Sequence, residues 1–242
     1  MSVPSSIPGD FANHGSKNGR HSVLARWLIE TFGQTFLREG TGVLDVAGGS
    51  GSLSFELSTR FGIPCTVVDP RDIKLNTIIK KRMRKISEMR SRDNRTEHNK
   101  NLPDYLKADE SLDDGHILDI VWDAIYKESV LPFHHIQKEF EYPFIESEDN
   151  QLIEDIIASS SAIVGCHPDQ ATGAIVDAAV AMNKPFAILP CCVFAELFNT
   201  REIDGRAVRT YEDLIDWLAL KSPGIRVAHL PFEGRNKVLY RL

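Results

Sequence analysis

The amino-acid sequence predicts an α/β protein built on a mostly parallel β-sheet, with helices on both faces and an antiparallel hairpin at the C-terminal end. Three observations lead to this prediction. Residues 42–70 read as strand, glycine turn, helix and strand, which is one βαβ crossover of a parallel sheet. Helical and strand-like segments alternate again from about residue 150 onward. The last two strand-like runs are joined by a five-residue turn, EGRNK, so they must pair antiparallel.

The N-terminal part combines a polar arm with a helix. Residues 1–15 are rich in Ser, Pro, Gly and Asn and are expected to be flexible, so we expect a single folded domain over 16–242. Apolar residues recur on one face from about Lys17 to Phe32, and Gly33 can end this helix. The strand, turn, helix and strand of 42–70 follow.

The C-terminal half repeats the order helix then strand. The predicted helices are 150–158, 171–182 and 211–220, and each precedes a strand-like run: SAIVGCHP, PFAILPCCVF and IRVAHLPF. The final strand is VLYRL. Residues 72–130 form an insert between the second strand and the next; its sequence is basic over 80–100 and acidic over 104–123.

The composition argues against several classes of protein. The chain has 242 residues and a formal net charge of −6, so it is not a general polyanion binder, and a nucleic-acid surface would have to be local. No run approaches the roughly 20 apolar residues that span a bilayer, and the first residues do not resemble a secretory signal. The four cysteines lie in apolar contexts, which favours reduced thiols and a cytoplasmic protein.

The glycine turn GVLDVAGGSGSL indicates a ligand site. Asp45, Gly49 and Gly51 stand at the spacing D-x-x-x-G-x-G, and the following helix N-terminus offers free N–H groups. A dinucleotide fingerprint would need Gly or Ala where Ser54 stands. S-adenosylmethionine offers a carboxylate and an ammonium, which suits an acidic residue at the strand end. Asp69 ends the second strand, 18 residues after Gly51, where its carboxylate can accept two ribose hydroxyls.

The sequence resembles the class I S-adenosylmethionine-dependent methyltransferases over roughly residues 20–242. LDVAGGSG looks like their first motif, with Ala47 where many members have glycine, and VVDP looks like their second. The resemblance implies a Rossmann-like, seven-stranded sheet. It also implies that the turn lines the methionine end of the cofactor, that Asp69 holds the ribose, and that Pro70 and Arg71 lie near the adenosine. The cofactor-binding residues expected are Asp45, Ala47, Gly48, Gly49, Ser50, Gly51, Asp69, Pro70, Arg71 and Cys166.

The loop GCHPDQ is the expected acceptor side of the site. In this fold the strand that ends at His167 is the neighbour of the glycine strand, and ligands sit at the carboxyl ends of parallel strands. We therefore expect His167, Asp169 and Gln170 to flank the reacting methyl group, with His167 as a general base of pKa near 6–7. In the alternative interpretation Asp169 only caps the following helix, and His167 only hydrogen-bonds the backbone or the cofactor.

GCHPDQATG and LPCCVF resemble a sub-branch with H-x-C-G-x-x-T-D and P-C-C motifs, which includes acceptor-stem tRNA 2′-O-methyltransferases. His167, Thr172 and 190–192 match, whereas Asp169-Gln170 replace Cys-Gly and Gly173 replaces the aspartate. This resemblance favours RNA as the acceptor. A small-molecule acceptor, or a non-catalytic domain that binds a partner protein, are the alternatives.

Three further features of the sequence bear on ligand binding. The basic stretch from Lys80 to Lys100 would either grip phosphates or form a solvated helix and loop. Lys17, Arg20 and His21 would either contact the cofactor or an anionic acceptor, or form a solvated helix start. We expect no metal site, on the argument that neighbouring cysteines in one strand point to opposite faces.

Overall fold

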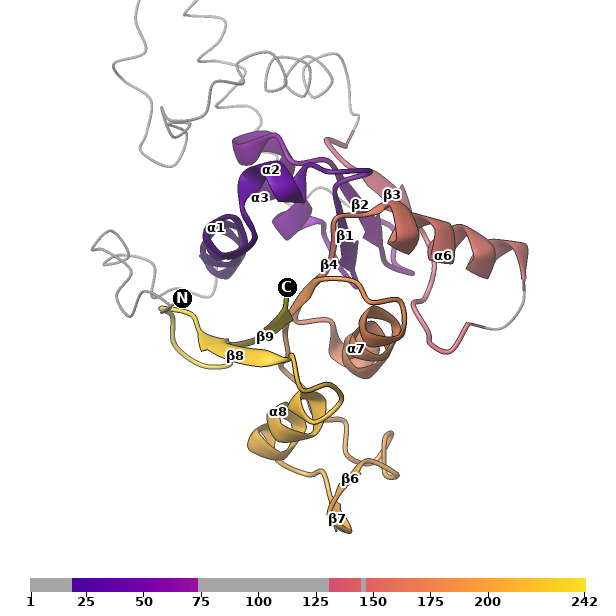
Figure 1. Ribbon diagram of the computed structural model, residues 1–242, viewed down its shortest axis with the longest axis vertical. Helices are drawn as coiled ribbons and strands as arrows, with labels where there is room; N and C mark the ends of the chain where they lie inside the picture. The colour runs from indigo at the N-terminus through magenta and orange to yellow at the C-terminus, as the bar shows by residue number, and fades with distance from the viewer. Residues whose placement is uncertain (1–18, 74–130, 145–146) are drawn as a thin grey trace, which may run out of the picture.

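A computed structural model describes residues 19–73, 131–144 and 147–242 (Figure 1). Its main sheet has seven strands in the order β3-β2-β1-β4-β5-β9-β8. All neighbouring pairs from β3 to β5 are parallel, whereas β9 is antiparallel to both β5 and β8. The predicted fold class is therefore confirmed. The strands are β1 Val43–Val46, β2 Cys65–Val68, β3 His134–Ile136, β4 Ala162–Cys166, β5 Phe186–Leu189, β8 Arg226–His229 and β9 Lys237–Arg241.

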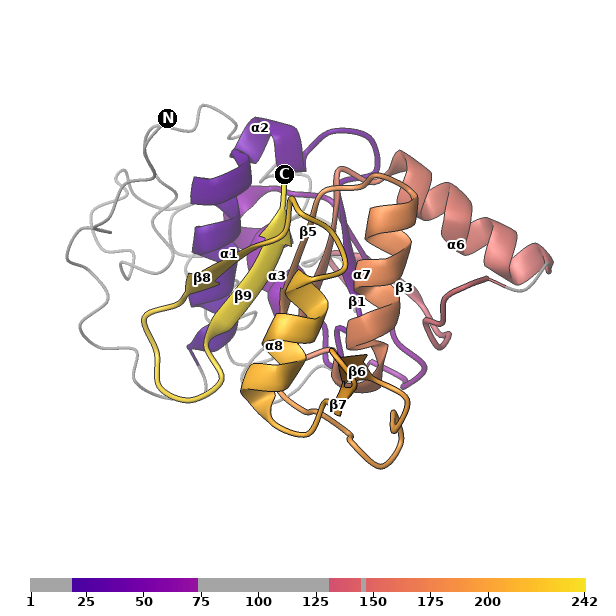
Figure 2. The same cartoon turned by 60° about the horizontal axis from the view of Figure 1, so that its bottom comes forward.

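Helices cover both faces of this sheet (Figure 2). Core residues of α1 and α3 pack on one face, and core residues of α6, α7 and α8 pack on the other. The helices are α1 Arg20–Phe32, α2 Gln34–Leu37, α3 Ser52–Phe61, α6 Glu148–Ser159, α7 Thr172–Ala181 and α8 Tyr211–Ala219.

Successive side chains of a strand point to opposite faces of the sheet and so belong to two different hydrophobic cores. In β1, Val43 belongs to the core beneath α1 and α3, while Leu44 belongs to the core beneath α6, α7 and α8. All four β1 residues are buried, as expected for a strand covered on both faces. Asp45 consequently points towards the α1 and α3 layer.

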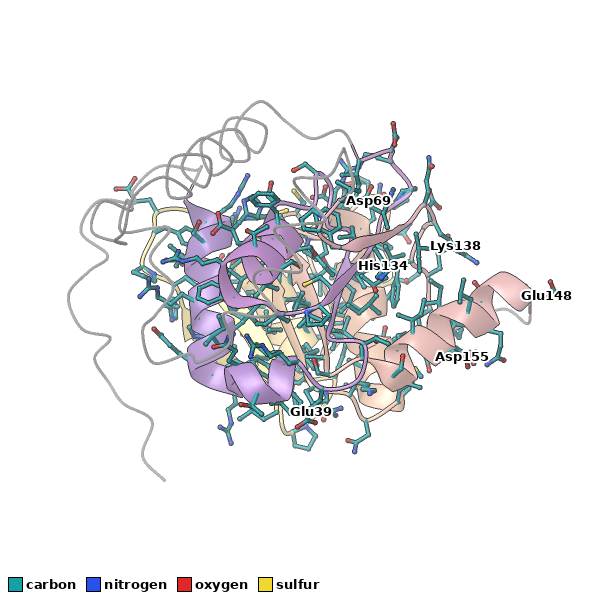
Figure 3. All side chains as sticks on the ribbon, turned by 90° about the horizontal axis from the view of Figure 1, so that it is seen from above. Glu39, Asp69, His134, Lys138, Glu148 and Asp155 are labelled. Atoms are coloured by element: carbon teal, nitrogen blue, oxygen red, sulfur yellow. The ribbon has the colours of Figure 1, made fainter. Side chains whose placement is uncertain are left out.

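The parallel strands give the sheet two distinct ends. Glu39 precedes β1 and Asp69 follows β2, and Figure 3 shows them at opposite ends of the molecule. The glycine turn after β1, Asp69 after β2 and His167 after β4 share the carboxyl end. This is the end at which α/β proteins bind ligands.

Several elements differ from the sequence-based expectation. Gly33, at φ +85°, ends α1 as predicted, but a short helix, α2, follows at once. A two-stranded ribbon of β6 Glu202–Ile203 and β7 Arg206–Ala207 was not predicted. In the terminal hairpin, β8 is shorter than the predicted strand and the connecting loop is longer, since His229 pairs with Lys237.

Three predictions lie outside the described residues: the N-terminal arm, nearly all of the insert at 72–130 with its basic stretch, and a contact from Lys17. Within the described ranges, no helix combines the length and apolar character that crossing a bilayer requires.

Candidate cofactor and acceptor site

The glycine turn is held open by left-handed backbone and by one contact to β2. Ala47 and Gly49 have φ of +54° and +60°, a region that non-glycine residues seldom adopt. The Gly49 N–H donates to Asp69 Oδ2 at 2.8 Å, which ties the turn to the end of β2. A Cβ at Gly48 would lie 2.8 Å from Asp45 Oδ2, so the close approach of this backbone to the carboxylate requires glycine.

Asp45 is a fully buried carboxyl group. Its Oδ2 accepts a hydrogen bond from Ser54 Oγ at 2.7 Å, while Oδ1 has no hydrogen-bond partner in the part of the chain that the structure describes. Burial raises the pKa of Asp45 to about 7, and the nearby Asp69 charge acts in the same direction. The Oδ1 atom can therefore accept a hydrogen bond from a bound ligand.

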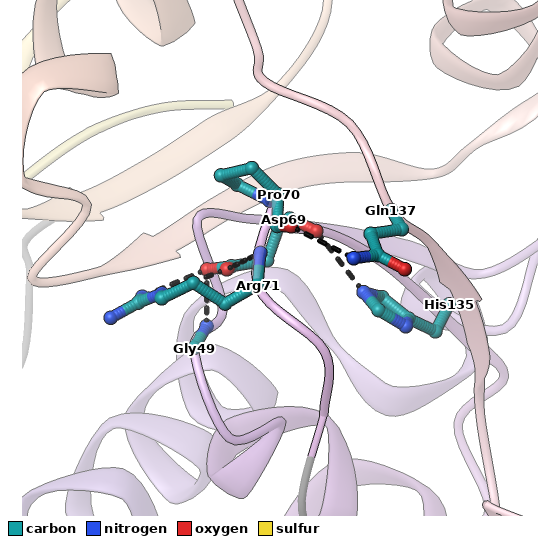
Figure 4. A network of polar contacts seen from close by, with 6 residues as sticks. All are labelled: Gly49, Asp69, Pro70, Arg71, His135 and Gln137. Atoms are coloured by element: carbon teal, nitrogen blue, oxygen red, sulfur yellow. Dashed lines mark hydrogen bonds and ion pairs between the residues drawn. The ribbon is translucent and has the colours of Figure 1, made fainter.

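Asp69 is buried and is covered by Arg71 (Figure 4). Arg71 Nε donates to Oδ1 and Arg71 Nη2 donates to Oδ2, each at 2.9 Å, and the Arg71 backbone N–H also donates to Oδ1. Burial opposes ionisation of Asp69, but these hydrogen bonds and the Gly49 N–H outweigh it and lower its pKa. The oxygens expected to accept ribose hydroxyls are thus engaged by an arginine whose side chain is 68% exposed.

The backbone after Asp69 is anchored by the neighbouring strand. His135 Nε2 lies 3.1 Å from the Asp69 carbonyl oxygen, which can only accept, so this nitrogen carries the proton. Gln137 Nε2 donates to the Pro70 carbonyl at 3.2 Å (Figure 4). These contacts fix the strand end that presents the Asp69 carboxylate.

His167 stands where β4 ends, at φ +57°. Its Nε2 lies 3.2 Å from Arg20 Nη1, and because a guanidinium only donates, Nε2 must be the unprotonated nitrogen. Burial and, to a lesser degree, the Arg20 charge lower the pKa of His167 to about 4. The expected pKa near 6–7 is therefore wrong for this arrangement.

Arg20, at the start of α1, lies at the same edge of the sheet as His167. Its side chain contacts His167 and is therefore not simply solvated. Its Nε is buried and has no hydrogen-bond partner among residues 19–73, 131–144 and 147–242. Both Arg20 and Asp45 act on the pKa of Cys166, which burial raises to about 12. Arg20, Asp45, Cys166 and His167 are therefore neighbours, and Cys166 stays a neutral thiol.

Asp169 does not cap a helix. It begins a 3₁₀ turn, Asp169–Ala171, and α7 has no side-chain cap. Thr172 Oγ1 donates to the Asp169 backbone carbonyl, while the Asp169 carboxylate accepts from Cys191 Sγ at 3.1 Å. The alternative interpretation of Asp169 as an N-cap is therefore wrong.

The two adjacent cysteines also differ from expectation. β5 ends at Leu189, so Cys191 and Cys192 lie beyond the strand and strand alternation does not apply to them. Their sulfur atoms are 3.4 Å apart. The argument that these thiols point to opposite faces is therefore wrong.

A cleft of about 960 Å³ opens at this end of the sheet. Of the predicted site residues, its walls include Ala47, Asp69, Pro70, Arg71, Asp169 and Gln170. The predicted residues outside its described lining are Asp45, Gly48, Gly49, Ser50, Gly51, Cys166 and His167.

Several residues that line the cleft were not predicted from the sequence. Arg201 is only 8% exposed, and its Cζ lies 3.6 Å from the centroid of the Phe198 ring and 4.7 Å from that of the Trp217 ring. Burial lowers its pKa to about 10, which leaves it charged at neutral pH. Phe140 and Tyr142 also line the cleft. Nothing in the local pattern of these residues signals a site, because they meet only through the fold.

Comparison with known proteins found only distant structural likenesses. No protein-family model matches the chain, and no curated protein matches it. Among solved structures, magnesium protoporphyrin IX methyltransferase from Synechocystis PCC 6803 has 10% identity and a TM-score of 0.41, over 98% of this chain and 87% of that one. The methyltransferase domain of bacterial CtHen1 has 13% identity and a TM-score of 0.45, over 93% and 99%. Human methyltransferase-like protein 13 has 11% identity and a TM-score of 0.41, over 92% and 81%.

At these identities and TM-scores, no argument rests on the likenesses. The strand order identifies the fold. A sheet ordered β3-β2-β1-β4-β5-β9-β8, in which β9 is antiparallel to both neighbours, is the Rossmann-like methyltransferase fold.

Proposed function

We propose that this protein is an S-adenosylmethionine-dependent methyltransferase. The observation that carries the proposal concerns two buried atoms at the carboxyl end of the sheet, Arg20 Nε and Asp45 Oδ1, which have no hydrogen-bond partner within the described residues. Unsatisfied buried polar atoms are rare and call for an explanation such as a missing ligand. The amino-acid end of S-adenosylmethionine has one carboxylate and one ammonium, which complement a guanidinium and a carboxylate.

The other residues of the turn and strand ends fit the same group. Gly48 and Gly49 keep the backbone close to the Asp45 and Asp69 carboxylates. Asp69 would hold the ribose once Arg71 moves aside or shares its oxygens. Bound S-adenosylmethionine would supply an electrophilic methyl group. The protein's share of the reaction is to position the acceptor and to remove its proton.

His167 is the candidate proton acceptor. As a neutral imidazole it can accept a proton only at Nε2, and Arg20 Nη1 already donates a hydrogen bond to that nitrogen. General-base catalysis by His167 therefore requires the Arg20–His167 contact to open. Arg20 is thus a positioning residue that determines when the His167 lone pair is available.

The cleft favours a small molecule as the acceptor. Its volume lies within the range of small-molecule sites. Its carboxylates outnumber its guanidinium groups by five to two, which would repel a phosphate backbone. The carboxylates are Asp69, Glu139, Glu141, Asp169 and Asp177, and the guanidinium groups are those of Arg71 and Arg201. Buried Arg201 would pair with a single anionic or planar group of the acceptor.

RNA is the second candidate, and the sequence observation that favours it is the basic stretch from Lys80 to Lys100. An RNA held there would show affinity that falls steeply with salt, because neutralised phosphates release counterions. Charge reversal at Arg82, Arg84 and Arg90 should then abolish RNA binding and leave cofactor affinity unchanged.

A transfer assay with methyl-labelled S-adenosylmethionine against separate metabolite, RNA and protein extracts tests the proposal. We expect label in the metabolite fraction, and loss of that label in Asp69→Ala. Label in RNA alone would select the second candidate. Absence of transfer and of cofactor binding would contradict the proposed function.

A further inference from the structure

We propose that Asp169, Cys191 and Cys192 form a binding site for one zinc ion. The proposal does not depend on methyltransferase activity. The three residues come from the ends of β4 and β5, which are parallel neighbours in the sheet, so the two chain segments meet at the carboxyl edge. The cluster is defined by the Asp169 carboxylate and the two adjacent thiols.

The distances between the three ligand atoms suit zinc. Cys191 Sγ lies 3.1 Å from Asp169 Oδ1 and 3.4 Å from Cys192 Sγ, and the three ligand atoms lie within 4.8 Å of one another. In a tetrahedral site the known Zn–S and Zn–O lengths place two sulfurs about 3.8 Å apart, and sulfur and oxygen about 3.6 Å apart. Side-chain shifts of a few tenths of an ångström would therefore seat the ion.

The ligand types select the metal. Two thiolates favour thiophilic ions over magnesium or calcium, and an added carboxylate oxygen suits zinc. Each thiol would lose its proton on binding, so two thiolates and one carboxylate would hold the ion and release two protons to solvent.

The cluster is accessible and its carboxylate is available. Asp169 and Cys192 are exposed and Cys191 is partly exposed, so an ion can enter without unfolding. Asp169 caps none of the described helices, and its carboxylate accepts a hydrogen bond from the Cys191 thiol. Three protein ligands leave one tetrahedral position for water, which is the pattern of catalytic rather than structural zinc sites. Since Asp169 also lines the cleft, the ion would lie at the edge of the candidate acceptor site.

Zinc binding to the reduced, metal-free full chain tests the proposal, with ZnCl₂ as the probe and a chromophoric chelator as the competitor. We expect one zinc per chain. Cys191→Ser and Cys192→Ser should each weaken binding more than about 100-fold, beyond the 10–100-fold typical of outer-shell changes. The buried thiol Cys65, remote from the cluster, provides the matched control, and Cys65→Ala should keep the wild-type affinity.

A second readout guards against misfolded variants. Because Asp169 and Cys192 are exposed, Asp169→Asn and Cys192→Ser should keep the wild-type circular dichroism spectrum. The cobalt-substituted protein should show a thiolate-to-metal charge-transfer band that weakens in Cys192→Ser. Absence of stoichiometric zinc, or zinc retained unchanged by both cysteine variants, would overturn the proposal.

Discussion

Arg20 and His167, 147 residues apart in the sequence, are in direct contact, with Arg20 Nη1 3.2 Å from His167 Nε2. The contact joins the start of α1 to the end of β4. It keeps His167 neutral and engages the only lone pair that could accept a proton. The candidate base and the candidate cofactor-binding cation are therefore coupled before any ligand arrives.

Removing Arg20 should make His167 more basic. In Arg20→Ala the nearby positive charge and the donor to Nε2 are both lost, so the His167 pKa should rise from about 4 towards its ordinary value. Burial remains as the larger cause and should keep the rise incomplete. An NMR titration of the His167 ring measures this. Arg26→Ala, an exposed change on the same helix, is the control, and an unchanged His167 pKa in Arg20→Ala would refute the coupling.

Asp45 should make the protein less stable as the pH rises. Its folded-state pKa of about 7 lies above the ordinary 3.8, so the folded state retains a proton that the unfolded chain has released. The free energy of unfolding should fall between about pH 4 and pH 7, by at most about 1.4 kcal/mol per pH unit from this group. Urea denaturation of wild type and Asp45→Asn across this range isolates the contribution. Parallel pH profiles for the two proteins would contradict it.

The same carboxyl group should make cofactor affinity depend on pH. Only ionised Asp45 pairs with an ammonium, so affinity for S-adenosylhomocysteine should drop about tenfold for each pH unit below about 7 and level off above it. Fluorescence or calorimetric titrations at several pH values measure the slope. Asp45→Asn should abolish the slope, and a variant that kept it would assign the proton to another group.

Arg71 should compete with the cofactor rather than hold it. Because the Arg71 side chain is 68% exposed, solvent screens its ion pair with the buried Asp69 to about 0–1 kcal/mol, so Arg71→Ala should raise affinity for S-adenosylhomocysteine by no more than about fivefold. Calorimetry on the variant checks the direction. A large loss of affinity would instead make Arg71 a direct contact of the adenosine, as the sequence resemblance implies.

Two substitutions at helix starts should separate a true cap from a functional carboxylate. Thr210 accepts from the Asp213 N–H in a capping box at the start of α8, so Thr210→Ala should lower the free energy of unfolding by about 0.5–2 kcal/mol. Asp169→Asn removes no cap and should change it by less than about 0.5 kcal/mol. Urea denaturation compares the two, and a larger loss in Asp169→Asn would mean that its carboxylate stabilises the fold.

The sequence predicted those parts of the molecule that local patterns encode. The glycine turn, its spacing to Asp69 and the short terminal hairpin were enough to predict a parallel sheet with an antiparallel end. The short helix α2 and the β6–β7 ribbon escaped prediction because a few residues carry little periodic signal.

The candidate site was predictable in its backbone positions but not in its side-chain partners. His167 lies at the predicted edge, yet its contact with Arg20 depends on how α1 packs over the sheet. Cys191 and Cys192 were assigned to a strand that ends two residues earlier, so their approach to each other and to Asp169 was missed. Such contacts arise from chain geometry beyond regular elements, which sequence periodicity does not record.

Calorimetric titration of the full chain with S-adenosylhomocysteine at pH 8 tests the central claim most directly. We expect binding at one site. In Asp69→Ala the binding free energy should weaken by about 1.5–3 kcal/mol, which is the contribution of hydrogen bonds to a charged group. Arg26→Ala, on the exposed side of α1, should bind as wild type does. Absence of binding by the wild-type protein, or binding of NAD in its place, would contradict the account.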